Sequence, residues 1–437
     1  MTGGLFASGR GDTPASGDAM DLLSLWQPGG FLLERDVMGV VGTGEARRLE
    51  IPPGRDQAVR AARLADAALA ELGIGDAVIV GSLPFRGDRA ASLFVPESVT
   101  VATAASRTVQ VVSRTGTGAM AMPVPAGRAR PRATAAGDVA RGNRDLHGRQ
   151  LSPLVWQPEP SVAGFGAAVA EAVRRIGAGR LTKVVLARSL VAANPGIDVR
   201  TLLAELRRRN PGCHLFASPA GAAGTFLGAT PETLVRREGD QVLSLPVAGT
   251  AARSPEPGRD ALIAAALLRS AKDLHEHAPV VEAVTDALAP YCSELAVEPT
   301  PHLLATATAW HLASSVRGTL RPPAPSALEL AAALHPTPAV CGTPTDAAAA
   351  LIEELEPAPR GLYAGLVGWV DGRGDGEWVV SVRCALITPR QVRLDAGAGI
   401  VAGSDPAAEI AETDVKFRTL IESLEAIRSA SVQALPA

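Results

Sequence analysis

The sequence is poor in the features that mark disulfide-rich, thiolate-metal and membrane proteins. Four cysteines occur in 437 residues, widely separated and never spaced as CxxC, which argues against a disulfide framework and a zinc knuckle. No stretch reaches the roughly 18 continuous apolar residues of a membrane span, and the first residues lack the basic and apolar regions of a secretory signal. We therefore expect a cytoplasmic protein with no membrane partner.

An excess of charge of one sign is also lacking. The formal net charge is −3, and the one strongly biased tract is segment 125–149, which is rich in Arg, Pro and Gly. This tract has no interleaved aromatic residues for base stacking, so we expect a basic surface loop and no nucleic-acid partner.

What the sequence does have is apolar material, 47% of all residues, which is enough for a sizeable core. Residues 1–20 are rich in Gly, Ser, Ala and Asp and predict a disordered tail. Apolar residues at helical spacing predict helices over 58–73, 161–180 and 259–288. Apolar runs directly after the first two predict strands over 77–81 and 181–191.

Short alternating stretches between residues 214 and 250 indicate a meander of antiparallel strands rather than a βαβ series. Near the C-terminus, segments 361–371, 376–387 and 391–401 predict three consecutive strands. The last helix begins at Ser404 or Asp405, both of which are good N-cap residues.

Two pairs of carboxylates share an i, i+3 spacing, Asp273 with Glu276 and Glu409 with Glu412. On a helix this spacing places both side chains on one face. Two such faces brought together would form a site of oxygen ligands, which Mg²⁺ prefers. Solvated helix faces carry similar pairs, and that alternative stays open.

Two further residues are candidates for acid–base chemistry. Lys183 lies in an apolar strand, where loss of hydration favours its neutral form and would make it a general base. Glu232 follows Pro231 at the join between two strands, and a poorly hydrated pocket would keep its carboxyl protonated as a general acid. An exposed strand-edge lysine and a turn glutamate facing water are the alternatives.

Cationic and polar groups in apolar contexts suggest a site for an anion. The Arg383 guanidinium can bind a carboxylate through two parallel hydrogen bonds, and Lys416, His311 and the Tyr363 hydroxyl could add to it. The glycines of segment 397–403 lie within a strand and indicate close approach to a ligand rather than a nucleotide-binding loop. Cations beside a metal site imply a substrate with more than one carboxylate.

Several segments in order along the chain resemble the chorismate-utilising enzymes, and most closely the isochorismate synthases. The resemblance runs from about Phe31 to the C-terminus. Its segments are KVVLAR, FLGATPETLVRR, LPVAGTAAR, KDLHEH, WHLAS, HPTPAVCGTP, GLVGWVD, GEWVVSVRCA, GAGIVAGSDP and ETDVK.

The resemblance implies a monomer with an α+β fold, in which residues 21–437 form one large domain of antiparallel sheets packed against helices. It implies an isomerase that binds Mg²⁺ and converts chorismate to isochorismate. The implied roles are base for Lys183, acid for Glu232, metal ligands for Glu276, Glu412, Glu409 and Asp273, and substrate contacts for Arg383, Tyr363, Lys416, Gly399 and His311.

Three positions bear on the reaction type. The ammonia-using relatives carry glutamine where this chain has Lys183, and some carry a nucleophilic lysine where it has Ala248, so water is the implied nucleophile. Ala339 and Val340 are close to the Ala-Leu pair of isochorismate synthases, with a slightly larger pocket. A salicylate synthase, which also eliminates pyruvate, and a chorismate-binding protein without catalysis remain alternatives, and siderophore and menaquinone synthesis both remain open as pathways.

Overall fold

The structure, a computed structural model, describes residues 21–433 except 37, 74, 76, 103–151 and 222–223, with no side-chain description for residues 431–433. The sequence-based expectations for the tail 1–20 and the basic segment 125–149 lie outside the described residues. None of the helices in the described part combines the length and apolar character needed to cross a membrane.

A large antiparallel sheet forms one half of the described fold. Strands β8 (Lys183–Ala193) and β22 (Gln391–Ile400) form its longest pairing, from Val184 opposite Ile400 to Ala193 opposite Gln391. Its order is β18-β8-β22-β21-β10-β9-β1-β2-β6, with β7 also paired to β8. The remaining bounds are β1 (Phe31–Arg35), β2 (Met38–Thr43), β6 (Ser98–Ala102), β7 (Gln157–Glu159), β9 (His214–Pro219), β10 (Thr225–Thr230), β18 (Gly342–Thr343) and β21 (Cys384–Ile387).

A second large sheet and a small third sheet complete the β-structure, and their pairings are also antiparallel. The second has the order β14-β17-β12-β11-β20-β19-β4-β5-β3, and the third β13-β16-β15. Their bounds are β3 (Arg47–Ile51), β4 (Val78–Leu83), β5 (Ala91–Val95), β11 (Thr233–Glu238), β12 (Gln241–Leu245), β13 (Val247–Ala252), β14 (Cys292–Val297), β15 (His302–Ala305), β16 (Ala309–Ala313), β17 (Val316–Leu320), β19 (Leu366–Asp371) and β20 (Gly376–Val380).

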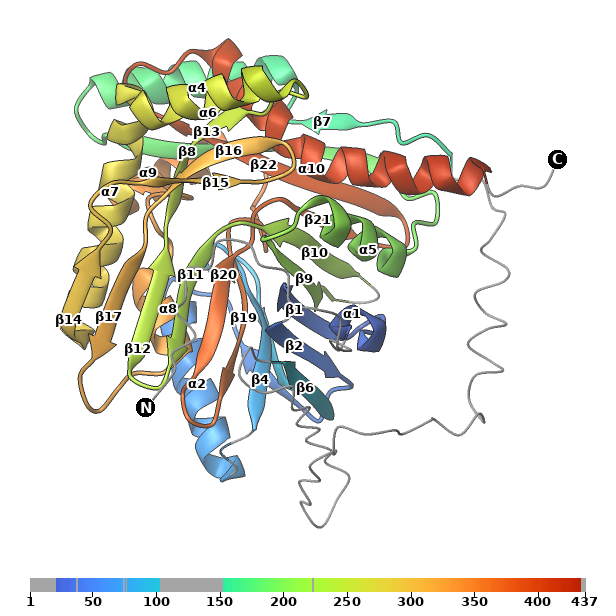
Figure 1. The fold of residues 1–437 in the computed structure, drawn as a ribbon, viewed down its shortest axis with the longest axis vertical. Helices are drawn as coiled ribbons and strands as arrows, with labels where there is room; N and C mark the ends of the chain where they lie inside the picture. The colour runs from blue at the N-terminus through green and yellow to red at the C-terminus, as the bar shows by residue number, and fades with distance from the viewer. Residues whose placement is uncertain are drawn as a thin grey trace.

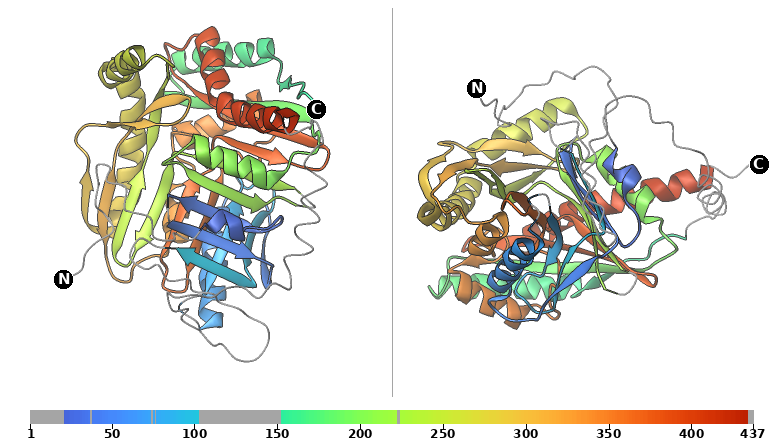
Figure 2. Two further views of the ribbon diagram at one scale, coloured as in Figure 1. Left: turned by 45° about the vertical axis from the view of Figure 1, so that its right-hand side comes forward. Right: turned by 90° about the horizontal axis from the view of Figure 1, so that it is seen from below.

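Helices flank these sheets. The helix bounds are α1 (Leu22–Leu25), α2 (Gln57–Leu72), α4 (Val162–Gly177), α5 (Val199–Arg209), α6 (Pro257–Arg269), α7 (Ala271–Leu288), η1 (Ala289–Tyr291), α8 (Ala327–Leu334), α9 (Thr345–Leu355) and α10 (Pro406–Gln433). Helix α10 packs on β22, α4 and α5, while α2 packs on α8 and α7 lies beside β13, β14 and β17 (Figures 1 and 2). The predicted α+β fold with antiparallel sheets is confirmed.

Local signals place several elements as predicted. Helix α2 ends where Gly73 adopts the left-handed conformation (φ +62°), which glycine reaches without strain. Helix α4 begins after Ser161, whose side chain accepts a hydrogen bond from the Gly164 amide. The Asp405 carboxylate accepts from the Ala408 amide at the start of α10, so Asp405 is the cap.

The single long helix predicted over 259–288 is wrong. The chain leaves the helical conformation at Ser270 (φ −69°, ψ +109°), which separates α6 from α7. The Ser270 side chain accepts a hydrogen bond from the Asp273 amide and caps α7. Asp273 therefore lies in the first turn of a new helix and not in the middle of a long one.

The single strand predicted over 376–387 is also wrong. It is divided between β20 in the second sheet and β21 in the first, and Arg383 stands at the join with a φ of +53°. A similar join, at Pro231 and Glu232, lies between β10 in the first sheet and β11 in the second. The two joins are tied together, because the Val380 amide donates to the Glu232 carbonyl and the Ala229 amide donates to the Arg383 carbonyl.

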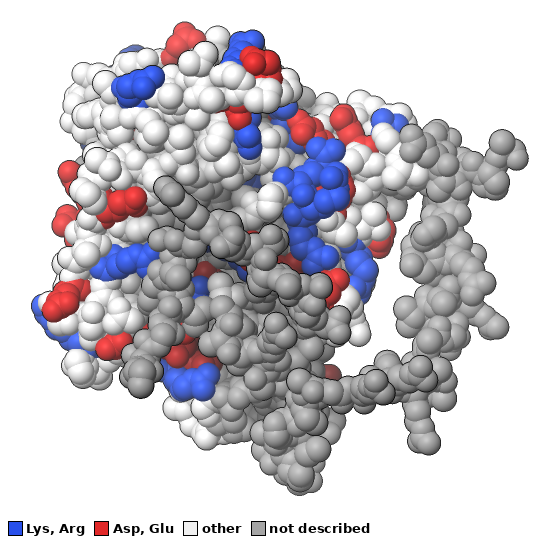
Figure 3. Space-filling view, in the orientation of Figure 1, with Lys and Arg blue, Asp and Glu red and all other residues white. Residues whose placement is uncertain are grey.

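Apolar side chains fill the space between sheets and helices in two large clusters, one of them beneath α5 and α10. Acidic and basic side chains lie close together on the face drawn in Figure 3. Near α5, for example, Arg207 pairs with Asp21 and both Arg208 and Arg209 pair with Glu205. These surface charges are paired with one another, whereas the charged groups described next lie inside the molecule.

Candidate active site

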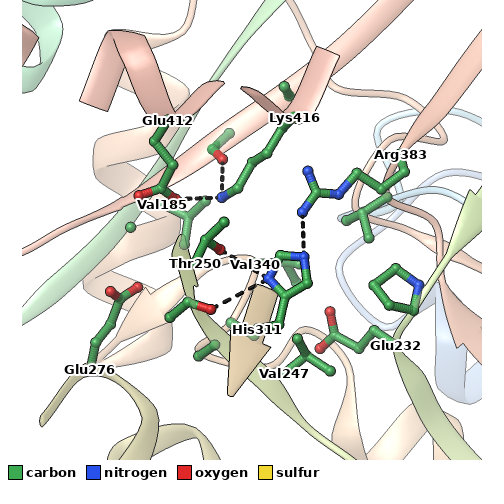
Figure 4. Close-up of a pocket in the computed structure, with 18 of the residues that line it drawn as sticks. Val185, Glu232, Val247, Thr250, Glu276, His311, Val340, Arg383, Glu412 and Lys416 are labelled. Carbon is green, nitrogen blue, oxygen red and sulfur yellow. Dashed lines mark hydrogen bonds and ion pairs between the residues drawn. The ribbon is translucent and has the colours of Figure 1, made fainter. Parts of the chain in front are cut away.

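A pocket of about 700 Å³, counted out to its mouth, lies at the two joins between the large sheets (Figure 4). Of the fourteen residues proposed from the sequence, it brings together twelve along its lining. These are Lys183, Glu232, Ala248, Glu276, His311, Ala339, Val340, Tyr363, Arg383, Gly399, Glu412 and Lys416. Asp273 and Glu409 are not part of this lining.

Lys183 is the first residue of β8 and is buried, with 4% of its surface exposed. Its Nζ lies 3.1 Å from an oxygen of Glu276 on α7. The alternative of an exposed strand-edge lysine is therefore wrong. A buried ammonium needs such a partner, since desolvation of an unpaired charge is costly.

Glu232 is also buried, and no ion pair to it is found in the described part of the chain. Burial raises the pKa of its carboxyl to about 8, although the positive charges of Lys183, Lys416 and Arg383 act in the opposite direction. At neutral pH the carboxyl is therefore mainly protonated. A turn glutamate facing water, the alternative weighed above, is wrong.

The acidic side chains of α7 and α10 influence one another electrostatically. Burial, with the charges of neighbouring carboxylates, raises the pKa of Asp273 and of Glu409. Burial acts likewise on Glu412, but Lys416 outweighs it and lowers the pKa of this group. The Lys416 Nζ lies 2.6 Å from Glu412 and donates to the Gly397 carbonyl at 2.8 Å.

These four carboxylates have the chemistry of a magnesium site, but they are not arranged as one. Within the described residues, no three His, Cys, Asp or Glu side chains are grouped closely enough to hold an ion. Instead, lysine ammonium groups pair with carboxylate oxygens, as Lys183 does with Glu276. One oxygen of Glu409 is buried without a hydrogen-bond partner in the described structure, and its donor chemistry fits a hard cation.

Arg383, in contact with His311, supplies positive charge on one side of the pocket. The Arg383 Nη2 lies 2.9 Å from the His311 Nε2, and both side chains are buried. The Arg383 Nη1 is buried without a partner among the described groups. A buried, unpaired donor of this kind is available for a carboxylate.

Two glycines of β22 leave room for functional side chains. A Cβ on Gly399 would overlap the carboxylate of Glu276 and crowd the Lys183 side chain, and a Cβ on Gly397 would crowd the Tyr363 hydroxyl. The sequence pattern predicted that a ligand approaches the backbone closely at these glycines. The structure shows that side chains of this chain make this close approach.

Some lining residues were not anticipated, and Thr250 of β13 is the clearest. Its Oγ1 lies 3.1 Å from the His311 Nδ1. Arg360, which is not itself part of the lining, was also missed. It donates to the Val340 carbonyl and to the Val185 carbonyl, both at 2.7 Å, and so ties together two sides of the pocket. The one available signal was their position, Thr250 within the LPVAGTAAR segment and Arg360 shortly before GLVGWVD.

The fold and pocket define an enzyme with a buried base candidate, a protonated acid candidate and cations for an anionic small molecule. Residues 90–425 match the family model described as chorismate binding enzyme. The chain belongs to this family.

Named relatives refine the comparison. The chain is 39% identical over 416 residues to isochorismate synthase DhbC of Bacillus subtilis, covering 93% of this chain and 96% of the relative. It is 38% identical over 350 residues to isochorismate synthase EntC of Escherichia coli, covering 80% and 81%. A crystal structure of a putative 2,3-dihydroxybenzoate-specific isochorismate synthase from Bacillus anthracis superposes with a TM-score of 0.78 at 35% identity, covering 92% of this chain and 98% of that one.

Proposed function

We propose that this protein is an isochorismate synthase, which interconverts chorismate and isochorismate. The observation that carries this proposal is that Lys183 and a protonated Glu232 line one pocket together with Arg383 and Lys416. The relatives with this name cover nearly the whole chain. A protein that merely bound chorismate would have no need of a buried acid and a buried base together.

Binding in this proposal depends on matching the two carboxylates of chorismate. Arg383 and the hydroxyl of Tyr363 hold the enolpyruvyl carboxylate, because the free Nη1 of Arg383 needs an acceptor. Glu276 and Glu412, supported by Asp273 and Glu409, would hold Mg²⁺. When bound, the ion would neutralise the ring carboxylate and fix the ring.

The chemistry exchanges one hydroxyl for another. Lys183 pairs with Glu276 as an ammonium, and once it has given up its proton its amine takes a proton from water, whose oxygen forms a bond to ring carbon C2. The C4–oxygen bond breaks as the ring double bonds shift, and Glu232 gives its proton to the departing hydroxyl, which leaves as water. One water enters and one leaves, so substrate and product are isomers and the reaction is reversible.

A product assay tests the proposed reaction. Purified protein supplied with chorismate and Mg²⁺ is expected to give an equilibrium mixture of chorismate and isochorismate, separated by chromatography, without pyruvate. Isochorismate supplied instead should return chorismate. Equimolar pyruvate and fluorescent salicylate would indicate a salicylate synthase, and unchanged chorismate would contradict enzymatic function altogether.

The metal assignment has a test that does not use turnover. Glu412→Gln is expected to weaken Mg²⁺ binding by about tenfold or more, because it removes the negative charge of one of the carboxylates proposed to hold the ion. Calorimetric titration of the chorismate-free protein measures this affinity. Glu422→Gln is the matched control on the same helix, where Glu422 pairs with Arg418 near the surface. Equal Mg²⁺ affinity in Glu412→Gln and the unmodified protein would contradict the assignment.

A further inference from the structure

A chain of hydrogen bonds joins Thr250, His311 and Arg383 along one wall of the pocket (Figure 4). The Thr250 Oγ1 lies 3.1 Å from the His311 Nδ1, and the Gly249 carbonyl lies 3.4 Å from the same nitrogen. The His311 Nε2 lies 2.9 Å from the Arg383 Nη2. His311 therefore lies between two hydrogen-bond partners, and only 2% of its surface is exposed to solvent.

The partners determine where the imidazole proton lies. A guanidinium nitrogen can only donate, so the His311 Nε2 must accept from Arg383. The single proton of a neutral imidazole therefore sits on Nδ1, which donates to the Thr250 hydroxyl or the Gly249 carbonyl. Burial, followed by the charge of Arg383, lowers the pKa of His311 well below its ordinary value, which keeps the ring neutral.

The backbone of Arg383 has an unusual conformation. It has a φ of +53° at the join between the two large sheets, a region that non-glycine residues rarely occupy. The Ala229 amide of β10 holds its carbonyl at 3.2 Å. The guanidinium is held from the third sheet, because His311 belongs to β16 and Thr250 to β13.

We infer that Thr250 and His311 are positioning residues, which fix the proton of the imidazole on Nδ1 and thereby aim the Arg383 guanidinium at a substrate carboxylate. This inference rests on the proposed function for the identity of the carboxylate. With Nη2 engaged by a neutral acceptor, Nη1 remains free toward the pocket. The arginine keeps its full positive charge for the substrate, since no carboxylate of the protein is hydrogen-bonded to it in the described structure.

The proton position can be observed directly. Long-range ¹H–¹⁵N correlation spectra of the protein at pH 7.5 are expected to show His311 as the neutral Nδ1–H tautomer, with the signal assigned by its loss in His311→Gln. His335 is an internal control of the opposite kind, because its Nε2 lies 2.8 Å from the Phe85 carbonyl and must carry the proton. An Nε2–H tautomer or a charged ring at His311 would overturn the inference.

Two substitutions at Thr250 separate positioning from packing. Thr250→Val keeps the shape of the side chain but removes the hydroxyl, and we expect the KM for chorismate to rise about tenfold with kcat within about threefold. The Arg383 guanidinium contacts a carboxylate that does not react, so it contributes equally to the binding of the substrate and of the transition state. Thr250→Ser should restore KM to within about twofold of the unmodified protein.

The spectrum and the kinetics together distinguish a failure of this inference from a failure of the proposed function. The spectrum needs no substrate, so a wrong tautomer would overturn the inference and leave the proposed function standing. No conversion of chorismate by the unmodified protein would overturn the function and leave the tautomer unaffected. A Thr250→Ser variant as impaired as Thr250→Val, or a Thr250→Val variant that loses kcat at unchanged KM, would also overturn the inference.

Discussion

Replacing Lys183 with alanine is expected to lower kcat for chorismate by about a thousandfold or more, while chorismate affinity changes by less than about tenfold, or roughly 1.4 kcal/mol. The loss falls on the transition state because an alanine cannot take the proton of the attacking water. Steady-state kinetics gives the turnover, and a binding titration gives the affinity. Much weaker binding with retained turnover would show that Lys183 is not the base.

The same substitution removes the partner of Glu276, so folding must be measured beside activity. Lys183→Arg is the matched variant, since it keeps a positive charge within reach of Glu276 but cannot give up a proton near neutral pH. It should fold normally and still lack turnover. Recovery of turnover in Lys183→Arg would contradict a role in proton transfer.

The fold was predictable where local patterns decide the structure. Helix α2 and strand β8 follow from apolar periodicity and from the glycine that ends α2. Sequence patterns failed where the chain changes direction without Gly or Pro. Ser270 lies within a stretch of helical spacing and Arg383 within an apolar run, so the sequence pattern gave no break at either residue. The Ser270 side-chain cap separates α6 from α7, and the passage from one sheet to the other separates β20 from β21.

The site was predictable residue by residue but not in its pairings. The resemblance identified twelve of the residues that line the pocket, yet no pattern in the sequence shows that Lys183 pairs with Glu276. That pair joins α7 to β8, which are far apart in the sequence, whereas Glu412 and Lys416 pair at i, i+4 within α10, a spacing that the sequence does show. Thr250 was missed for the same reason, because its partner His311 is remote in sequence and adjacent only across β13 and β16.

The pairings give the pocket an ordered division of charge. Two of the three glutamates proposed as metal ligands are each balanced by a buried or half-buried lysine, Glu276 by Lys183 and Glu412 by Lys416. Glu232 has no such partner and is held neutral by burial. The acid is therefore separated from the carboxylates by its environment rather than by its residue type.

Replacing Glu232 with glutamine is expected to lower kcat by about a hundredfold to ten-thousandfold, because an amide cannot protonate the departing hydroxyl. In the unmodified protein, turnover of chorismate should fall as the pH rises through about 8, where the Glu232 carboxyl loses its proton. A pH profile of kcat measured at saturating chorismate checks this alkaline decrease in turnover. Turnover that rises through the same range would contradict the role of general acid.

The pH dependence of folding stability tests the protonation of the same carboxyl, and the raised pKa determines its direction. Between pH 4.5, the ordinary value, and about 8 the folded state keeps the Glu232 proton that the unfolded state has lost. The unmodified protein therefore loses stability over this range relative to Glu232→Gln, which stays neutral throughout. Urea midpoints should favour Glu232→Gln more at pH 8.5 than at pH 5.

Glu377→Gln is the matched control for both measurements. Burial acts to raise the pKa of Glu377, but His214, whose Nε2 lies 3.0 Å from this carboxylate, outweighs it and lowers the value. Its substitution should leave the alkaline limb of turnover unchanged and should not raise stability at pH 8.5, because the ionised carboxylate is the favoured form in the folded state. A gain in stability at pH 8.5 from both substitutions would trace the effect to general charge removal and not to the buried acid.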